Sequence, residues 1–109
     1  VLRASQAHTD ASKGTEMIFE TTPNGSTSRT QRLWIGSEGG VTIGGTAPSA
    51  DAKLDIQGTD GAVLMPRLTT TNRNALTGSA GMMIYNTTVD SMQIHNGTAW
   101  LNILTGPSS

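Results

Sequence analysis

Turn-forming residues interrupt this chain so often that it can fold into little besides short strands. The 109 residues include 13 glycines and 4 prolines, and many of these stand beside Asn, Asp or Ser. The runs between them, such as residues 16–22 and 41–43, are rich in β-branched and aromatic side chains, which is typical of strands joined by tight turns. The pattern predicts a mainly β fold made of short-stranded hairpins and meanders.

The chain has little material for a hydrophobic core. Hydrophobic residues make up 35% of it and aromatic residues 4%, whereas soluble domains are closer to about 45–50% apolar. A domain this small buries a modest fraction of its surface, and no disulfide can compensate because the sequence has no cysteine. We therefore expect the chain to complete its core by self-association.

The spacing of the strand-like runs and turns predicts the individual elements. The strands are expected at residues 16–22, 30–36, 41–43, 52–57, 82–85 and 92–95, followed by a last strand that ends near residue 104. One helix of about two turns is expected at residues 69–76. Thr69 or Thr70 can serve as its N-cap, and Gly78 would stop it.

These elements divide the chain into four segments. Residues 1–13 are interpreted as an N-terminal arm or a connection to an upstream region, and residues 14–45 as a β-hairpin, shaft-like segment. Residues 46–104 would hold a strand, the helix and a three-stranded meander in a tip-like segment, and residues 105–109 a polar tail. The Gly- and Ser-containing residues 44–49 are expected to be a flexible joint and the main internal boundary. The length fits one domain or a piece of a longer protein.

The most patterned stretch is GMMIYNTTVDSMQIHNGTAW, residues 81–100. Its Asn96-Gly97 pair is a strong signal for a two-residue type I′ hairpin turn, which would place His95 opposite Thr98. The predicted ribbon has an apolar face of Met92, Ile94, Ala99 and Leu101, and a second face of Gln93, His95, Thr98 and Trp100.

Two long stretches resemble segments of bacteriophage tail-fibre and other virion-appendage proteins. QRLWIGSEGGVTIGGTAPSADAKLDI, residues 31–56, is similar to a recurring strand, turn and V-x-I-G strand, and FETTPNGSTSRTQR is similar to the strand and loop that often precede it. GAVLMPRLTTTNRNALTGSAGMMIYNTTVDSMQIHNGTAW, residues 61–100, is similar to fibre segments with L-x-R-L-T-T, a brief helix, G-M-x-I-Y-N-T and Y-N-G-T-x-W. The chain departs from this pattern at Asn72, where Gln is frequent, and at His95, where an aromatic residue is frequent.

The resemblance implies a homotrimeric fibre, either intertwined or packed along one axis. This agrees with the need for self-association that the composition indicates, since each large aliphatic side chain buried between copies adds roughly 1.5–3 kcal/mol. The candidates for the trimer core are Leu54, Ile56, Val63, Leu64, Met82, Ile84, Met92, Ile94 and Leu101.

The same resemblance implies a role on the surface of a virion. We expect a structural, non-enzymatic fibre or spike component that contributes to host-surface attachment. Its partners would be other copies of the chain, other virion proteins, and a glycan or protein of the host cell surface. Two alternatives stay open: a head fibre, capsid decoration or fibre connector, and a non-catalytic trimerising module of a polysaccharide depolymerase.

The residues offer no catalytic or metal-binding arrangement. His8 stands two residues before Asp10 in the arm, where a solvated pair is the better interpretation than a metal site, and His95 has no carboxylate at a fixed spacing. Glu16 and Glu20 share a strand face but lie about 13 Å apart, farther than a pair of glycosidase carboxylates. We expect no cofactor and no metal.

Charge and hydropathy exclude two further classes of partner. The net charge is −1 and the 7 basic residues form no stripe, so nucleic-acid binding has little electrostatic support. No apolar run approaches the roughly 18 residues of a membrane span.

A ligand face is the remaining functional hypothesis. Gln93, His95, Thr98 and Trp100 would combine an aromatic platform with several hydrogen-bonding groups, a mixture that suits surface glycans. The alternative is that Trp100 packs into the trimer or beneath the helix.

Overall fold

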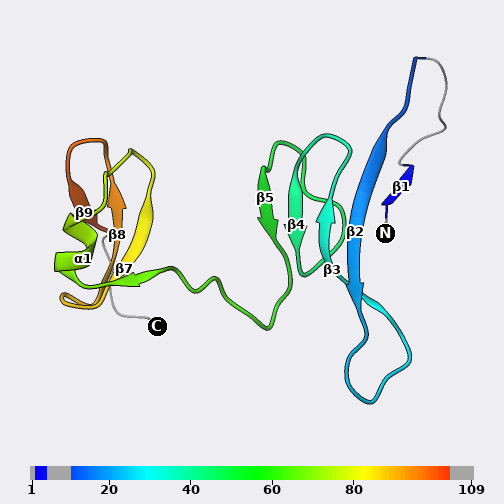
Figure 1. Ribbon diagram of the computed structural model, residues 1–109, viewed down its shortest axis with the longest axis horizontal. Coiled ribbons are helices and arrows are strands. Elements are labelled where there is room, and N and C mark those ends of the chain that lie inside the picture. The colour runs from blue at the N-terminus through cyan, green and yellow to red at the C-terminus, as the bar shows by residue number, and fades with distance from the viewer. Residues whose placement is uncertain (1, 5–10, 104–109) are drawn as a thin grey trace. The chain divides into compact units, whose positions relative to one another are not determined.

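The structure is a computed structural model that describes residues 2–4 and 11–103. These residues form two compact units, Val1–Ala62 and Val63–Ser109 (Figure 1). Each unit is built on its own small β-sheet, and the two sheets share no strand. The mainly β class with one short helix is therefore confirmed.

The first unit contains a five-stranded sheet in the order β1-β2-β3-β4-β5 (Figure 1). Its strands are β1 Leu2–Ala4, β2 Thr15–Thr21, β3 Thr30–Ile35, β4 Val41–Ile43 and β5 Leu54–Ile56. Strands β1 to β4 pair in antiparallel fashion and β5 runs parallel to β4. The predicted strands of this region are confirmed, whereas β1 lies in the segment that we interpreted as an arm.

The turns of this sheet are made by glycines in the left-handed region. Gly25, with φ +81°, follows Pro23 in the turn between β2 and β3, and Gly39, with φ +93°, reverses the chain between β3 and β4. Backbone bonds close the second turn from Gly36 N to Gly40 O and from Gly39 N to Gly36 O, at 2.9 and 3.0 Å. The glycine-containing turns inferred from the sequence are therefore the turns at which these strands end.

Residues 44–53 fold back along β4 and return the chain as the parallel strand β5. Thr46 N donates to Gln57 Oε1 at 3.0 Å, and Gln57 Nε2 donates to the carbonyl of Ala47 at 3.2 Å, so the loop is tied to the end of β5. The segment expected to be a flexible joint is thus part of the first unit. The two units divide after Ala62 instead. Strand β5 belongs to the first unit because it pairs with β4. The local sequence pattern does not show this pairing, because the paired residues are far apart in the sequence.

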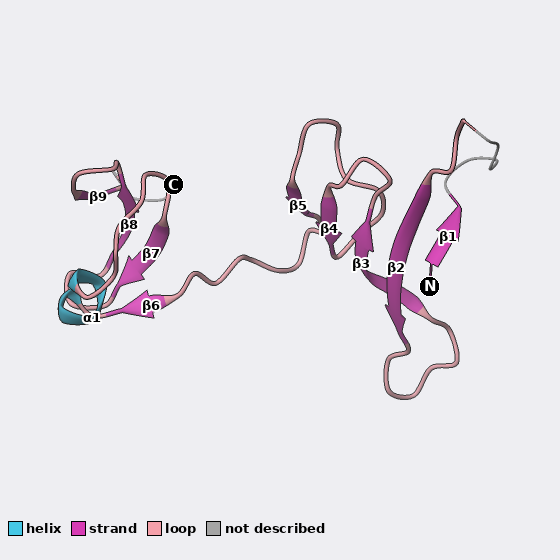
Figure 2. Ribbon diagram, turned by 45° about the horizontal axis from the view of Figure 1, so that its top comes forward, coloured by secondary structure: helices cyan, strands magenta, loops and turns pink. Residues whose placement is uncertain are grey.

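The second unit contains a four-stranded sheet in the order β6-β7-β8-β9 and one helix (Figure 2). Its elements are β6 Arg67–Leu68, α1 Thr70–Asn74, β7 Met83–Asn86, β8 Ser91–His95 and β9 Trp100–Asn102. Strands β7, β8 and β9 form the predicted antiparallel meander. The two-residue β6, which runs parallel to β7, was not predicted from the sequence.

Helix α1 is shorter than the predicted residues 69–76. Thr69 is its N-cap, as one of the two predicted alternatives, and its Oγ1 accepts a hydrogen bond from Asn72 N at 3.2 Å. Thr and Asn make up most of the helix and have low helix propensity, which accounts for its end at Asn74. A further turn follows in which Leu76 N donates to Arg73 O.

The turn between β8 and β9 differs from the predicted type I′ turn. His95 pairs with Trp100 rather than Thr98, and Ile94 pairs with Leu101. The side chain of Asn96 accounts for this, because its Oδ1 accepts hydrogen bonds from the N–H groups of Thr98 and Ala99 at 2.9 and 2.8 Å. Only Gly97 of this dipeptide has positive φ, whereas a type I′ turn requires it at both residues. The predicted register was therefore wrong by two residues.

The tied loop of the first unit gives a prediction about acid stability. Hydrogen bonds from Gln57 Nε2 and from Ser49 N lower the pKa of Asp55 below its ordinary 3.8. The stabilisation is therefore complete above that ordinary value and is lost as the pH falls below it through the folded-state pKa. Asp55→Asn should remove this pH-dependent contribution to the free energy of unfolding.

Urea unfolding of both forms at neutral pH and in the acid range below 3.8 measures the difference. We expect the gap in unfolding free energy between wild type and Asp55→Asn to narrow on acidification. A gap that stays constant over this range would contradict the assignment.

Candidate functional site

The first sheet has one face made wholly of apolar side chains. The register aligns them in two rows across four strands, so that each residue lies beside its neighbours on the next strand. We call this the apolar sheet face; it consists of Met17, Ile35, Val41 and Leu54 in one row and Phe19, Leu33, Ile43 and Ile56 in the other.

Within the first unit, the described residues do not cover this face. Leu54 is 60% exposed and Phe19 50%, and Met17, Ile43 and Ile56 are also exposed. A contiguous apolar surface of this kind marks an interaction site rather than an ordinary solvated face. Among the described residues, the buried hydrophobic side chains are limited to Ile18, Trp34 and Ile84, which is a very small core for two sheets.

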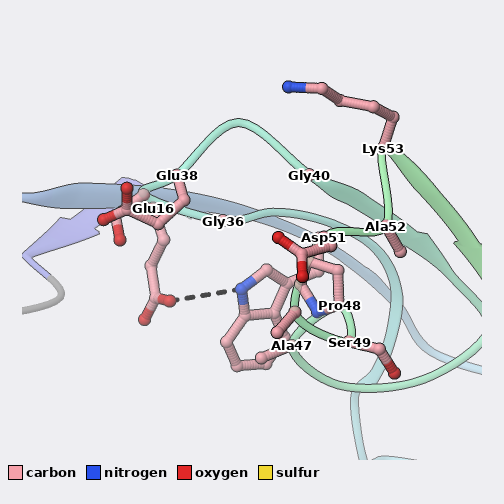
Figure 3. Close-up of a pocket in the computed structure, with 13 residues that line it drawn as sticks. Glu16, Gly36, Glu38, Gly40, Ala47, Pro48, Ser49, Asp51, Ala52 and Lys53 are labelled. Atoms are coloured by element: carbon pink, nitrogen blue, oxygen red, sulfur yellow. Dashed lines mark hydrogen bonds between the residues drawn. The ribbon is translucent and has the colours of Figure 1, made fainter.

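The opposite face of the first sheet is covered by its own chain. Trp34 is buried there, and its indole N–H donates to Glu16 at 3.2 Å (Figure 3). The Arg3 guanidinium lies 4.8 Å from the centroid of the Trp34 ring and pairs with Glu16. Pro48, from the returning loop, packs against the turn at Gly40, where an added Cβ would stand 3.0 Å from its Cγ. The first unit thus covers this side itself, and the side also holds the buried Ile18.

A pocket of about 460 Å³ opens on this covered face (Figure 3). Trp34 and Pro48 line it together with the acidic side chains of Glu16, Glu38 and Asp51. Glu16 is already engaged by Trp34 and Arg3, so the pocket presents its remaining carboxylates to solvent. It lies across the sheet from the apolar sheet face, because Glu16 and Trp34 belong to the opposite set of strand positions.

The second sheet repeats this division. Its uncovered side, which we call the second apolar face, is formed by Met83, Tyr85, Met92, Ile94, Leu101 and Ile103. Met83 and Leu101 are exposed at 39% and 47%, and the other four are half-buried. Both units therefore leave an apolar sheet surface without cover from their own chain.

The covered face of the second sheet is held by a polar network. Asn86 is fully buried, and its Nδ2 donates to Thr70 Oγ1 and to Gln93 Oε1, both at 3.1 Å. Arg73 Nη1 donates to the same Gln93 oxygen at 2.9 Å, and Gln93 Nε2 donates to Asn102 Oδ1 at 2.8 Å. These bonds fasten α1 to the sheet where most domains would use apolar packing.

His95 is packed at the end of this network. Its Nδ1 accepts a hydrogen bond from Gly97 N at 3.0 Å, and its ring meets Trp100 edge to face with centroids 5.0 Å apart. A Cβ added at Gly78 would overlap the imidazole, so the residues that follow α1 lie directly against His95. This histidine is 8% exposed and serves as a packed core residue in the chain.

The four predicted ligand residues therefore differ in how exposed they are. Gln93 and His95 are buried beneath α1 and the segment after it, Thr98 is exposed in the turn, and Trp100 is half-buried. They do not form one exposed face of the single chain, because the covered side of this sheet is its polar side. Ligand binding by these residues stays a prediction.

The trimer-core candidates also lie on different faces and segments of the two units. Leu54 and Ile56 lie on the apolar sheet face, Met92, Ile94 and Leu101 lie on the second apolar face, and Val63 and Leu64 are exposed in the segment that precedes β6. By contrast, Ile84 is 4% exposed and Met82 shares its side of the sheet, so both lie on the face that the chain itself covers. Met83, the residue between them, lies on the second apolar face, where it pairs with Ile94. A place in the trimer core for each of these candidates stays a prediction.

Sequence reasoning missed the β2, β3, β4 and β7 members of these faces. The signal was present as alternation: Met17 and Phe19, Leu33 and Ile35, and Val41 and Ile43 each stand two residues apart. Met83 and Tyr85 follow the same rule. His8, considered for metal binding with Asp10, lies outside the described residues.

Two further features are absent from the described residues: a metal-binding group of side chains and a membrane-spanning helix. Within residues 2–4 and 11–103, no group of three or more His, Asp or Glu side chains is placed to hold a metal ion. The same residues include no helix long and apolar enough to cross a membrane.

Comparison with known proteins identifies one family. The family model described as a phage tail-like trimerisation region matches residues 42–109, which is 68 of the 109 residues. No curated protein matches the chain.

The polar network gives a prediction about stability. Asn86→Ala should lower the free energy of unfolding by about 1–3 kcal/mol, because it removes the hydrogen bonds that the fully buried Asn86 amide makes to Thr70, Gln93 and Thr88 N. The control is Asn102→Ala, which removes one bond at the exposed end of the network. Urea unfolding followed by circular dichroism measures the loss of unfolding free energy in both variants. An equal loss in Asn86→Ala and Asn102→Ala would contradict the central place of Asn86 in the network.

Proposed function

The chain belongs to the phage tail-like trimerisation family, and from this premise we propose that it is a structural, non-enzymatic subunit of a trimeric fibre or spike on a phage particle. One observation supports this most strongly: within the described residues, each unit covers one face of its sheet and leaves the other, apolar face exposed. Such a chain gains its missing core from copies of itself.

The energetic argument follows from the small number of buried side chains. With Ile18, Trp34 and Ile84 as the buried hydrophobic residues of the described part, one chain gains little from apolar burial. Each exposed aliphatic side chain that becomes buried between copies adds roughly 1.5–3 kcal/mol. Leu101 and Leu54, at 47% and 60% exposure, have much of that gain still available.

The proposed role in attachment rests on the turn between β8 and β9. Fibres and spikes carry the surfaces by which phages meet their hosts, and the turn at residues 96–99 presents the exposed Thr98 next to the half-buried Trp100. An aromatic ring with a hydroxyl beside it suits a glycan of the host surface. We assign attachment to this turn and restrict the candidate ligand residues to Thr98 and Trp100.

Oligomeric mass tests the trimer. Light scattering on the folded chain should give three times the mass of one chain. Leu101→Glu should dissociate it, because three carboxylates would replace apolar side chains on the second apolar face. Thr98→Glu, in the exposed turn next to that strand, is the matched control and should stay trimeric. A wild-type chain that remains a stable monomer would refute the proposal.

Adsorption tests the attachment role. Particles carrying Trp100→Ala should adsorb to host cells more slowly, by at least about tenfold if the indole is a binding hot spot. Asn24→Ala, at an exposed turn of the other unit, serves as the control. Unchanged adsorption by Trp100→Ala particles that keep trimeric fibres would remove this turn from the attachment site. Release of reducing ends from host polysaccharide by the protein would contradict the non-enzymatic role.

A further inference from the structure

The family match begins in the middle of the first sheet. Its first residue is 42, inside β4, so β2 and β3 lie outside the region that the family model describes. Yet these two strands supply half of the apolar sheet face: Met17 and Phe19 from β2, and Leu33 and Ile35 from β3. The structural surface therefore extends beyond the matched region.

The register makes this surface continuous. Leu54 and Val41 continue directly into Ile35 and Met17, and the second row continues in the same way from Ile56 to Phe19. Neighbouring strands lie about 4.8 Å apart, so the rows run unbroken for roughly 14 Å from β5 to β2. A partner that covered β4 and β5 alone would end in the middle of an apolar row.

The other side of the sheet cannot serve in place of this one. Trp34 on that side is already closed by Arg3, Glu16 and the returning loop around Pro48. The uncovered side is therefore the one that the first unit can offer to a partner.

We infer that the two other copies of this chain cover the whole apolar sheet face, so that the trimer interface extends over β2 and β3 as far as Met17 and Phe19. This inference rests on the proposed trimer and adds to it the strands outside the matched region. The β1–β3 part of the first unit is then a structural part of the trimerisation surface rather than an appendage to it.

The chemistry of the face favours a copy of the same chain as the occupant. All eight side chains are apolar, so the face offers no charge or hydrogen-bonding group by which a different partner would be recognised. Its β4 and β5 part, with Ile43, Leu54 and Ile56, lies inside a region whose family associates as trimers. Continuity with that interface extends the same occupant to the rest of the rows.

Phe19 gives the first test, with the full chain and a matched pair of substitutions. Phe19→Glu places three carboxylates in the interface, whereas Phe19→Leu keeps the position apolar. Phe19 is half exposed in the single chain, so neither change disturbs the chain's own packing strongly. The chain concentration at which the trimer dissociates should rise at least about tenfold for Phe19→Glu and change little for Phe19→Leu.

Thiol labelling gives an independent second test, since the chain has no cysteine of its own. A maleimide should label Phe19→Cys more slowly in the trimer than in the dissociated chain. Glu20→Cys, the next residue and on the other side of β2, should react equally in both states. This test does not depend on the Phe19→Glu chain folding well.

The outcomes separate this inference from the proposed function. A wild-type trimer whose dissociation is unaffected by Phe19→Glu would overturn the extended interface and leave the trimer standing. Equal labelling of the Phe19→Cys thiol in the trimer and in the dissociated chain would do the same. A wild-type chain that is monomeric at all concentrations would refute the trimer itself.

Discussion

Alternation of side chains along a strand is the constraint on which this structure depends. A strand residue points to one of two faces, and in both sheets the covered face is the mixed one, where polar groups lie beside the buried Ile18, Trp34 and Ile84. The covered faces hold Trp34 with Glu16 and Arg3 in one unit, and Asn86 with Gln93 in the other. The apolar faces stay exposed in each unit, and in the proposed trimer they make the contacts between chains.

The two covered faces use directional contacts where a larger domain would use apolar packing. A cation over an indole and a network of amide side chains fix geometry well, because each bond has a preferred distance and angle. They contribute less stability than the burial of the same area of apolar surface, since polar groups exchange bonds with water. Each unit is thus shaped by its polar contacts, and its stability depends on the apolar ones that association supplies.

The sequence predicted the strands more accurately than it predicted their environment. Gly25 and Gly39 marked the turns of the first sheet, and the Asn96-Gly97 turn was located correctly, although the side chain of Asn96 changed its type and moved the register by two residues. Because that shift is even, the membership of each ribbon face survived it. Which face would be covered did not follow from the sequence, since polar residues such as Gln93 and His95 are expected outside. The parallel partner β5 and the short β6 were hidden for another reason: their pairing joins residues that no local pattern connects.

The uncovered apolar faces also bear on how the protein is made. In the proposed trimer, a newly synthesised chain keeps these apolar side chains exposed to solvent until it meets two others, so the rate of assembly depends on the concentration of chains. During that interval the same surfaces can adhere to unrelated molecules, and productive assembly competes with aggregation. For the proposed trimer, the exposure of Met17, Phe19 and Leu54 in the single chain thus makes the yield of folded protein depend on how quickly chains meet.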